Sequence, residues 1–360
     1  MRLDKQIEAK VKEVNEALRA YLPKEEGQQR TIFEAMNYSV WAGGKRLRPM
    51  FLQSVYEMFA GADEDAGAGA DAGAADAGLR QGAGDMASSA VSGAMRDAGR
   101  YGGTQGDGWR GAPVPPGAVA PFVAAIEMIH TSSLIHDDLP CMDNDTLRRG
   151  LPTTWVKFGD DLGVLAGDAL MLYAFEVAAK AFEAVGGPHT GKAAPSALHY
   201  ARIGRAIGVL AQKSGIYGMV GGQTLDVELT GKPIWPEQLQ FIYRLKTGAL
   251  LEAAFVIGAI LGGANEEQIH KIEQVAGNVG FAFQIQDDIL DVEGDIKALG
   301  KPVLSDEKNQ KSTYVTIYGM EAAKNEVARL SRLAMDTLRT LPGDPVFLAG
   351  LIEKLITRRF

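Results

Sequence analysis

The sequence lacks most features that mark a secreted, membrane-spanning or nucleic-acid-binding protein. It has one cysteine, Cys141, so an intramolecular disulfide is excluded and a reducing compartment is favoured. No apolar run reaches the ~18 residues of a membrane span, and the charged N-terminus has no signal-peptide core. The net charge of −8 leaves no basic excess for nucleic acid. We therefore expect a cytoplasmic protein without a membrane span and without a nucleic-acid partner.

Strand signals are also missing, because no alternating apolar pattern leads into a turn such as Asn-Gly. Helical patterns dominate instead, and residues 3–22 place an apolar side chain every three or four positions. Further apolar helices are expected at residues 119–138, 161–185, 201–219 and 248–262, and from about 268 to 292. Apolar residues make up 46% of the chain, enough for a large core. We predict an all-α bundle that forms one domain over residues 1–360.

One stretch, residues 61–117, differs in composition from the rest. It contains 15 glycines and 14 alanines, carries −4 of the net charge, and ends in a Pro-rich run at residues 112–116. Its few large apolar residues bury too little surface to offset the entropy of ordering the chain. We interpret it as a disordered Gly/Ala-rich, low-complexity insertion within the domain. A functional lid is the alternative, since long loops sometimes carry function.

Two acidic clusters carry most of the functional argument, and the clearer one lies at residues 284–291. On a helix, Asp287 and Asp291 lie one turn apart on the same side, and Asp288 is rotated by about 100°. The flanks are apolar and residues 272–296 contain no Lys or Arg, so a bound cation is needed to offset the repulsion. Mg²⁺ prefers oxygen ligands and completes its shell with water and phosphates. A solvated acidic helix face is the alternative.

The first cluster, at residues 136–145, follows another apolar helix. This helix must end or bend near Pro140, because proline disfavours helical geometry in the residue before it. Asp143 therefore need not follow helical spacing and can fold back towards Asp137 and Asp138. Alone, the segment also fits an Asp/Asn-rich turn or a loose calcium loop. The second, similar cluster later in the chain favours a metal site at both.

Anionic ligands need cations, and basic residues lie near both clusters. Three of them follow Gly43-Gly44, although the spacing is not that of a Walker loop. The arginines after the first cluster are suited to bidentate contacts with phosphate oxygens. The basic residues in question are Lys45, Arg46, Arg48, Arg148, Arg149, Lys246, Lys301 and Lys311. Together with the two acidic clusters, they describe a site for two diphosphates.

Seven short motifs follow one another along the chain. They are Gly-Gly-Lys-Arg-Leu-Arg-Pro, Leu-Ile-His-Asp-Asp-Leu-Pro-Cys-Met-Asp-Asn-Asp, Leu-Arg-Arg-Gly, Leu-Ala-Gly-Asp-Ala-Leu, Gly-Gly-Gln-Thr-Leu-Asp, Lys-Thr-Gly and Phe-Gln-Ile-Gln-Asp-Asp-Ile-Leu-Asp. In order and spacing, the chain outside residues 61–117 resembles the trans-polyprenyl diphosphate synthases, in their bacterial farnesyl and plastid-type geranylgeranyl branch. The resemblance implies a helical bundle of the isoprenoid synthase type, a homodimer, and more than one Mg²⁺ ion per active site. Thr146 departs from it, where relatives often carry an acidic residue that is not a core ligand.

The resemblance also implies roles for single residues. The metal ligands it implies are Asp137, Asp138, Asp143, Asp287, Asp288 and Asp291, of which the first five, with Lys246, are the predicted catalytic groups. For the allylic diphosphate it implies Arg148, Lys246, Thr247, Gln284, Lys301 and Lys311. For isopentenyl diphosphate it implies Lys45, Arg48, His130 and Arg149. A lone histidine is more often structural, so His130 depends on this match, and Cys141 is interpreted as structural because no base accompanies it.

The implied reaction joins isopentenyl diphosphate to dimethylallyl, geranyl or farnesyl diphosphate. Metal ions and cationic side chains stabilise the departing diphosphate, and apolar walls shield the allylic carbocation from water. Product length is expected to depend on Ser132 and Ser133, about one turn before Asp137. Farnesyl-producing members of the family tend to have an aromatic residue at the position of Ser132. Serine therefore predicts geranylgeranyl diphosphate, with farnesyl diphosphate as the alternative.

Two other kinds of function fit parts of the pattern. A class I terpene cyclase with the same fold should have one Asp-rich motif and an Asn/Ser/Glu metal triad. A non-catalytic prenyltransferase subunit, or a helical interaction protein, should have degenerate acidic motifs. Both acidic motifs are intact in this sequence, and a Lys-Arg motif precedes them. A prenyltransferase is therefore the prediction.

Overall fold

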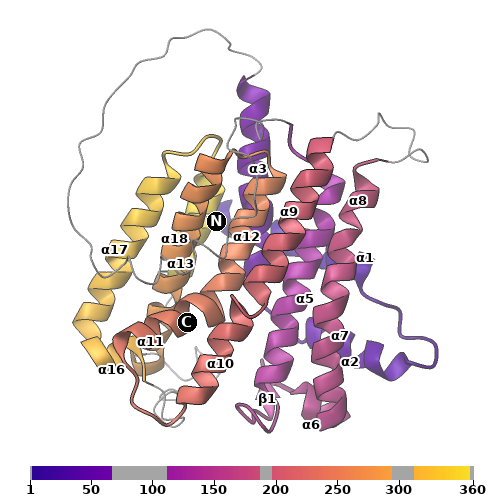
Figure 1. Cartoon of the computed structure of the whole chain (residues 1–360), viewed down its shortest axis with the longest axis vertical. Helices are drawn as coiled ribbons and strands as arrows, with labels where there is room; N and C mark the ends of the chain where they lie inside the picture. The colour runs from indigo at the N-terminus through magenta and orange to yellow at the C-terminus, as the bar shows by residue number, and fades with distance from the viewer. Residues whose placement is uncertain (1, 67–111, 187–196, 294–311, 357–360) are drawn as a thin grey trace.

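The computed structural model describes residues 2–66, 112–186, 197–293 and 312–356, and most of them are helical (Figure 1). The long helices are α1 (Arg2–Tyr21), α2 (Arg30–Trp41), α3 (Leu47–Ala66), α5 (Ala120–Asp137), α7 (Asp160–Ala179), α9 (Ala197–Ser214), α10 (Met219–Leu229), α12 (Ala249–Leu261), α13 (Glu266–Glu293), α17 (Met320–Leu338) and α18 (Val346–Ile356). Shorter elements connect them, namely η2 (Pro116–Ala118), α6 (Thr154–Phe158), α8 (Ala181–Ala184), α11 (Pro236–Ile242), the π-helix η3 (Tyr243–Gly248), α16 (Tyr314–Tyr318), and the strands β1 (Leu147–Arg148) and β2 (Leu151–Pro152). The described residues form no sheet beyond this β1–β2 hairpin, so the predicted all-α fold is confirmed.

Two apolar helices form the centre of the bundle. Every residue of α12 except Glu252 is buried, and α5 is buried over most of its length. Helix α12 packs against α3, α9 and α13, while α5 packs most extensively against α7. A Cβ atom at Gly258 of α12 would lie 2.5 Å from the carbonyl oxygen of Leu52, so α3 approaches α12 at backbone distance. A helix surrounded in this way needs apolar side chains on all sides, which explains its lack of a polar face.

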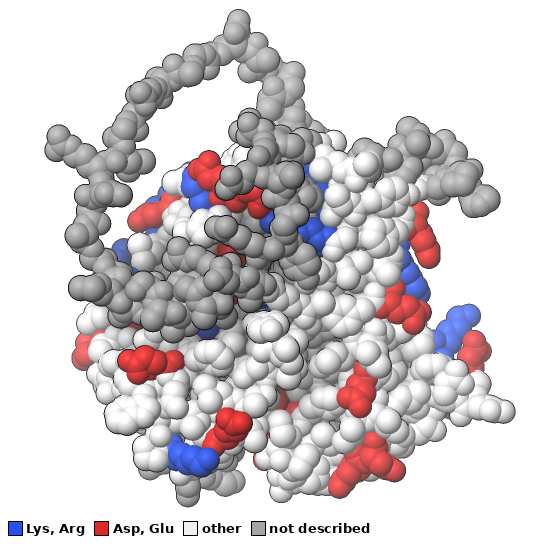
Figure 2. Space-filling view, in the orientation of Figure 1, with Lys and Arg blue, Asp and Glu red and all other residues white. Residues whose placement is uncertain are grey.

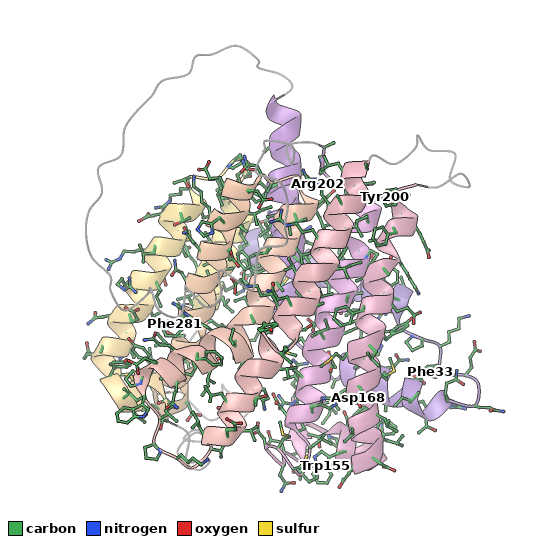
Figure 3. All side chains as sticks on the ribbon, in the orientation of Figure 1. Phe33, Trp155, Asp168, Tyr200, Arg202 and Phe281 are labelled. Carbon is green, nitrogen blue, oxygen red and sulfur yellow. The ribbon has the colours of Figure 1, made fainter. Side chains whose placement is uncertain are left out.

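The C-terminal end of α12 is held by a fully buried arginine of α9. Arg202 Nη1 donates a hydrogen bond to the carbonyl oxygen of Ile260 at 2.7 Å, and Nη2 donates to that of Gly263 at 3.2 Å. A cation at this position offsets the partial negative charge of the last helical carbonyls. Figure 3 shows Arg202 towards one end of the bundle and Trp155 at the other. The buried arginine therefore supports packing at the end away from Trp155.

The boundaries predicted for the insertion are too wide at both ends. Helix α3 continues through residues 61–66, and the Pro-rich run packs onto the core. Val114 is fully buried, its N–H donates to the carbonyl oxygen of Leu261 at 2.9 Å, and its own carbonyl accepts from the Tyr56 hydroxyl at 2.7 Å. Composition averaged over the whole stretch hid these two anchored ends. The remaining residues, 67–111, lie outside the described part of the chain.

Two segments are long and apolar enough to cross a membrane by composition alone, Pro116–Asp137 and Asp160–Ala184. The first is 78% buried within the bundle, which is typical of a core helix. The second is 39% buried, and its helix α7 packs mainly against α5, α2 and α6. On the face seen in Figure 2, the Lys and Arg side chains of the described residues do not gather into one patch.

Candidate active site

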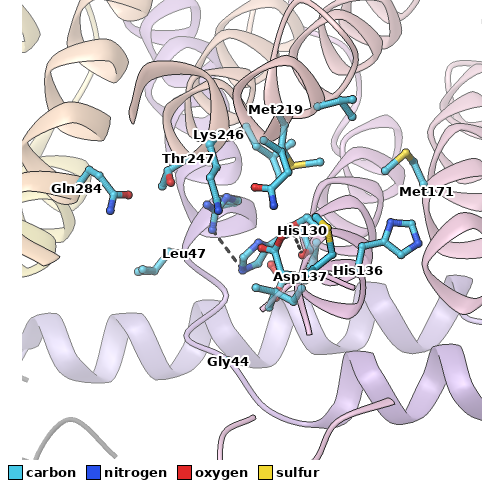
Figure 4. A pocket seen from close by; sticks show the side chains of 18 of the residues that line it. Gly44, Leu47, His130, His136, Asp137, Met171, Met219, Lys246, Thr247 and Gln284 are labelled. Carbon is cyan, nitrogen blue, oxygen red and sulfur yellow. Dashed lines mark hydrogen bonds between the residues drawn. The ribbon is translucent and has the colours of Figure 1, made fainter. Parts of the chain in front are cut away.

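A cavity of about 1060 Å³ lies where α5 ends, between the α2–α3 turn, α5, α7, α10, η3 and α13. Figure 4 shows Lys246 and Thr247 on one side of it and His130 and Asp137 on another. Ten of the residues predicted to bind metal or substrate or to control product length line it, namely Lys45, Arg48, His130, Ser133, Asp137, Arg149, Lys246, Thr247, Gln284 and Asp287. Much of the remaining wall is apolar and includes Met142, Met171, Met219, Leu250 and Phe283. The fold thus brings one carboxylate of each acidic cluster to the same cavity as the predicted cations.

The aspartates of the first acidic cluster have different surroundings: Asp137 lines the cavity, whereas Asp138 forms an ion pair with Arg148. Helix α5 ends at Asp137, and the chain folds back so that the N–H of Asp143 donates to the carbonyl oxygen of Asp137 at 2.9 Å. Asp138 is 3% exposed and accepts from Arg148 Nε at 2.8 Å through each oxygen. Burial raises the pKa of Asp138, although Arg148 favours its charged form. Asp138 and Arg148, predicted to bind metal and diphosphate, therefore bind each other in this structure.

The second acidic cluster is divided in the same way. Asp287 lines the cavity, whereas Asp288 is 3% exposed and accepts from the Tyr243 hydroxyl at 2.6 Å and the Tyr314 N–H at 2.7 Å. Asp291 is 6% exposed and is not part of the cavity wall. Rotation by about 100° per residue explains why neighbouring aspartates face different surroundings. Of this cluster, Asp287 is the carboxylate placed to meet a ligand in the cavity.

The carboxylates at the cavity suit Mg²⁺, which is bound partly by water and substrate, better than they suit a metal ion bound by protein side chains alone. Within the described ranges, no three His, Cys, Asp or Glu side chains are grouped closely enough to enclose a metal ion. Mg²⁺ does not need such a cage, because it commonly uses one or two carboxylates with water and substrate phosphates. Asp137 and Asp287 supply hard oxygen ligands on the cavity wall, and the nearby cations suit a phosphate-bearing substrate. These residues fit a magnesium–diphosphate ligand.

A second group of cations lies at the turn between α2 and α3. Gly44 has a φ of +135°, a backbone conformation that favours glycine, and the Arg149 guanidinium lies against it. Arg48 Nη1 lies 3.4 Å from His130 Nε2, and Arg48 Nε is buried without a partner among the residues described. Burial, together with the charge of Arg48, lowers the pKa of His130 well below its usual value. A neutral imidazole and several cations therefore face this side of the cavity.

The resemblance implied no substrate contact for Arg46, and the structure shows it on the cavity wall and largely buried. Arg46 and Glu127 are 4% and 2% exposed, and Arg46 Nη1 donates to Glu127 Oε1 at 2.7 Å. Arg46 Nη2 also donates to the carbonyl oxygen of Val40 at 2.7 Å. Its backbone has a φ of +52°, in the left-handed region that few non-glycine residues adopt. Glu127, a lone acidic residue in an apolar helix, was the available signal for this pair.

The third group of predicted residues lies on η3 and α13. Lys246 and Thr247 belong to the π-helix, an irregularity that is frequent at functional sites, and Gln284 of α13 lines the same cavity. Lys246 Nζ donates to Asp226 Oδ2 at 2.6 Å. Asp226 ends the Gly-Gly-Gln-Thr-Leu-Asp motif, for which sequence reasoning predicted no function. Lys301 and Lys311, also predicted to bind diphosphate, lie outside the described residues.

The two serines predicted to control product length do not lie on the same face of α5. Ser133 lines the cavity one turn before Asp137, and its hydroxyl donates to the carbonyl oxygen of His130 at 2.8 Å. Ser132 is fully buried and is not part of the cavity wall. It lies one turn before His136, whose ring occupies the space that a side chain at Gly167 of α7 would fill. Ser132 therefore faces the α5–α7 contact.

The comparison with known proteins agrees with this geometry. The sequence profile of the polyprenyl synthetase family matches residues 114–339. The chain is 36% identical to the large subunit 1 of a heterodimeric geranylgeranyl pyrophosphate synthase of Arabidopsis thaliana, over 94% of this chain and 75% of the relative. It is 35% identical to the farnesyl diphosphate synthase of Geobacillus stearothermophilus, over 96% and 94% of the two chains. The chain belongs to the polyprenyl synthetase family.

Solved structures support the same conclusion for this polyprenyl synthetase. The apo structure of an FPP/GFPP synthase from Zymomonas mobilis has a TM-score of 0.71, 28% identity, and 99% coverage of both chains. A geranyltransferase from Helicobacter pylori, complexed with magnesium and isoprenyl diphosphate, has a TM-score of 0.67 and 26% identity, with 98% of this chain and 95% of that chain covered. The predictions of an isoprenoid synthase fold and of a prenyltransferase are confirmed.

Proposed function

We propose that this prenyltransferase joins isopentenyl diphosphate to an allylic diphosphate with the help of more than one Mg²⁺ ion. The observation that carries the proposal is that Asp137 and Asp287, from clusters far apart in the sequence, line one cavity together with Lys246 and the arginines at the α2–α3 turn. When bound there, Mg²⁺ would stabilise the negative charge that develops on the diphosphate. The Helicobacter pylori geranyltransferase, complexed with magnesium and isoprenyl diphosphate, supports this assignment.

Different residues of the chain bind the two diphosphate substrates. Asp137 and Asp287 would hold the Mg²⁺ that binds the allylic diphosphate. Lys246, Thr247 and Gln284 orient this diphosphate, and the Lys246 ammonium stabilises its charge as the C–O bond breaks. The apolar wall excludes water from the allylic cation that remains. The double bond of isopentenyl diphosphate attacks that cation, and the proton is then lost to the released diphosphate.

Isopentenyl diphosphate is bound at the α2–α3 turn. Lys45, Arg48 and Arg149 line this part of the cavity and supply positive charge. Because its pKa is lowered, His130 donates as a neutral imidazole over the physiological pH range and does not add to the local positive charge. This division keeps the nucleophilic substrate and the ionising substrate on separate cations.

We propose geranylgeranyl diphosphate as the main product, with farnesyl diphosphate as the alternative. The supporting observation is that Ser133, a small residue, lines the cavity one turn before Asp137. An aromatic ring at this level would fill space that the growing prenyl chain needs. Known relatives include both geranylgeranyl and farnesyl synthases, so the family alone leaves the product open.

Incubation with labelled isopentenyl diphosphate and dimethylallyl diphosphate should give a C20 product as the largest fraction after dephosphorylation. Ser133→Tyr is expected to shift the main product to C15 or shorter, because the ring enters the cavity directly. Ser132→Tyr is expected to do so less completely, because it must first displace the α5–α7 contact and move towards Met171. Ser133→Ala is the matched control and should leave chain length unchanged. A C15 wild-type product, or an unchanged product from Ser133→Tyr, would contradict the assignment.

We further propose that the protein is a homodimer that pairs through α7. Among its residues Leu172, Leu165 and Val164 are 72%, 54% and 42% exposed, an unusual density of large apolar side chains on one helix face. Leu172→Asp is expected to convert the dimer to a monomer in light-scattering chromatography, because it places a charge in a desolvated interface. Leu333→Asp on α17, where the leucine is 42% exposed, is the control. Equal masses for both variants and wild type would exclude α7 as the interface.

A further inference from the structure

Helix α10 and the π-helix η3 meet at backbone distance. A Cβ atom at Gly222 would lie 2.2 Å from the backbone nitrogen of Lys246 and 2.7 Å from the carbonyl carbon of Leu245. Only glycine fits at this point, because the nearest atoms are backbone and cannot turn aside. Gly222 thereby fixes the distance between the two helices at the residue that bears the cavity lysine.

One helical turn after Gly222, Asp226 reaches the side chain of that lysine. Asp226 Oδ2 and Lys246 Nζ are 2.6 Å apart, and the two side chains are 18% and 23% exposed. Lys246 and Thr247 line both the main cavity and a smaller one of about 130 Å³, whereas Asp226 lines the smaller cavity alone. Asp226 therefore holds the ammonium from behind, on the side away from the main cavity.

This arrangement leaves the lysine able to bind a second acceptor. An ammonium group has three N–H donors, and the contact with Asp226 uses one of them. A lysine side chain also loses ~2 kcal/mol of rotamer entropy when it is fixed, and an existing contact removes part of that loss before the substrate arrives. A charge that is already oriented stabilises a leaving diphosphate better than one that must reorient.

We propose that Asp226 is a positioning residue that acts through Lys246. It holds the ammonium towards the main cavity, so that the allylic diphosphate meets it already oriented. The inference rests on the proposed role of Lys246 in binding the allylic diphosphate. It gives a function to the last residue of the Gly-Gly-Gln-Thr-Leu-Asp motif, which neither lines the main cavity nor belongs to an acidic cluster.

A merely structural role for Asp226 makes a different prediction, because a structural tie would act on α10 and η3 as a whole. Gly222 already determines the approach of these helices, so the side-chain pair is not needed to bring them together. Loss of a structural contact would lower the stability of the protein. Its effect on kcat would multiply with the effect of a second substitution, such as Lys246→Ala. Loss of a positioning residue would lower kcat only while the lysine is present.

The test is a double-mutant cycle on Asp226→Ala and Lys246→Ala, with kcat, KM and melting temperature measured for all four proteins. Lys246→Ala is expected to lower kcat by ~100-fold, the scale for removal of one electrostatic stabiliser. Asp226→Ala is expected to lower kcat by ~10-fold through misplacement of the ammonium. In the Lys246→Ala background, Asp226→Ala should change kcat by less than about 2-fold, since nothing is left to position.

Controls separate the possible failures. Asp226→Asn keeps an oxygen acceptor for Lys246 and should retain most of the activity that Asp226→Ala loses. Glu266→Ala removes an exposed ion pair with Arg205 on other elements and should leave kcat unchanged. If the double variant loses kcat by the product of the two single losses, Asp226 acts independently of Lys246 and the positioning role is wrong. Full activity of Lys246→Ala would instead overturn the proposed role of the lysine itself.

Discussion

Replacing either Asp137 or Asp287 with asparagine is expected to lower kcat by ~100-fold or more, the scale for loss of a major electrostatic stabiliser at a transition state. Both carboxylates line the cavity of about 1060 Å³, and they come from helices α5 and α13, which lie far apart in the sequence. Asparagine keeps the size and one oxygen of the side chain but removes the charge that attracts Mg²⁺. The measurement is the steady-state rate with labelled isopentenyl diphosphate over a range of Mg²⁺ concentrations.

The matched control is Asp336→Asn on α17. Its carboxylate is 70% exposed and pairs with Arg339 at the surface, so the same chemical change should leave kcat within about 2-fold of wild type. Excess EDTA should abolish the activity of every variant. Full turnover in EDTA, or by either cavity variant, would exclude the metal assignment. Melting temperatures close to that of wild type would show that the loss of rate is not a loss of fold.

Much of the fold could be predicted from the sequence, because its signals are local. The apolar spacing of residues 3–22 and the nearly unbroken apolar run of α12 each require helices, whatever surrounds them. The insertion shows the limit of composition. Val114 lies in a Pro-rich, Gly/Ala-rich stretch, yet it is fully buried because a hydrogen bond to Leu261 ties it to the end of α12. A contact between residues far apart has no local signal.

The site could be predicted as a set of residues but not as a geometry. Sequence motifs pointed to both acidic clusters, and one aspartate of each lines the cavity. They did not distinguish Asp137 from Asp138, or Asp287 from Asp288, because that distinction depends on which way a helix faces after packing. The partners that separate them, Arg148 and Tyr243, come from other segments. The carboxylates that pair with Arg46 and Lys246, namely Glu127 and Asp226, were missed for the same reason.

The clearest example of a missed partner is the ion pair between Arg46 and Glu127. Three basic residues within four suggested a phosphate site, and all three line the cavity. One of them, Arg46, is 4% exposed and holds Glu127 of α5, the carbonyl of Val40 and, at 3.2 Å, the Asn15 side chain of α1. Arg46 thereby joins α1, α2 and α5 beneath the turn that presents the other two cations.

Removal of one member of this pair is expected to lower the free energy of unfolding by ~3–5 kcal/mol, because it leaves a buried charge without its counter-charge. Arg46→Met and Glu127→Leu should each show a loss of this size in urea denaturation. The double variant should lose much less than the sum of the two, since apolar groups of similar volume replace a buried ion pair with little net change. Met at position 46 meets the same positive φ as Arg, so backbone strain is matched across the cycle.

An exposed pair of the same type shows why burial, and not the ion pair as such, sets the size of this effect. On α17, Arg329 Nε and Nη2 each donate to Glu326 at 2.7 Å, but Arg329 is 53% exposed. Arg329→Met should therefore change stability by ~0.5 kcal/mol or less, because water solvates both charges when the pair is broken. If Arg46→Met costs no more than Arg329→Met, the pair does not hold the turn. If the double variant at Arg46 and Glu127 loses the full sum, the two residues act independently, and the positions of Lys45 and Arg48 must depend on the glycines of the turn instead.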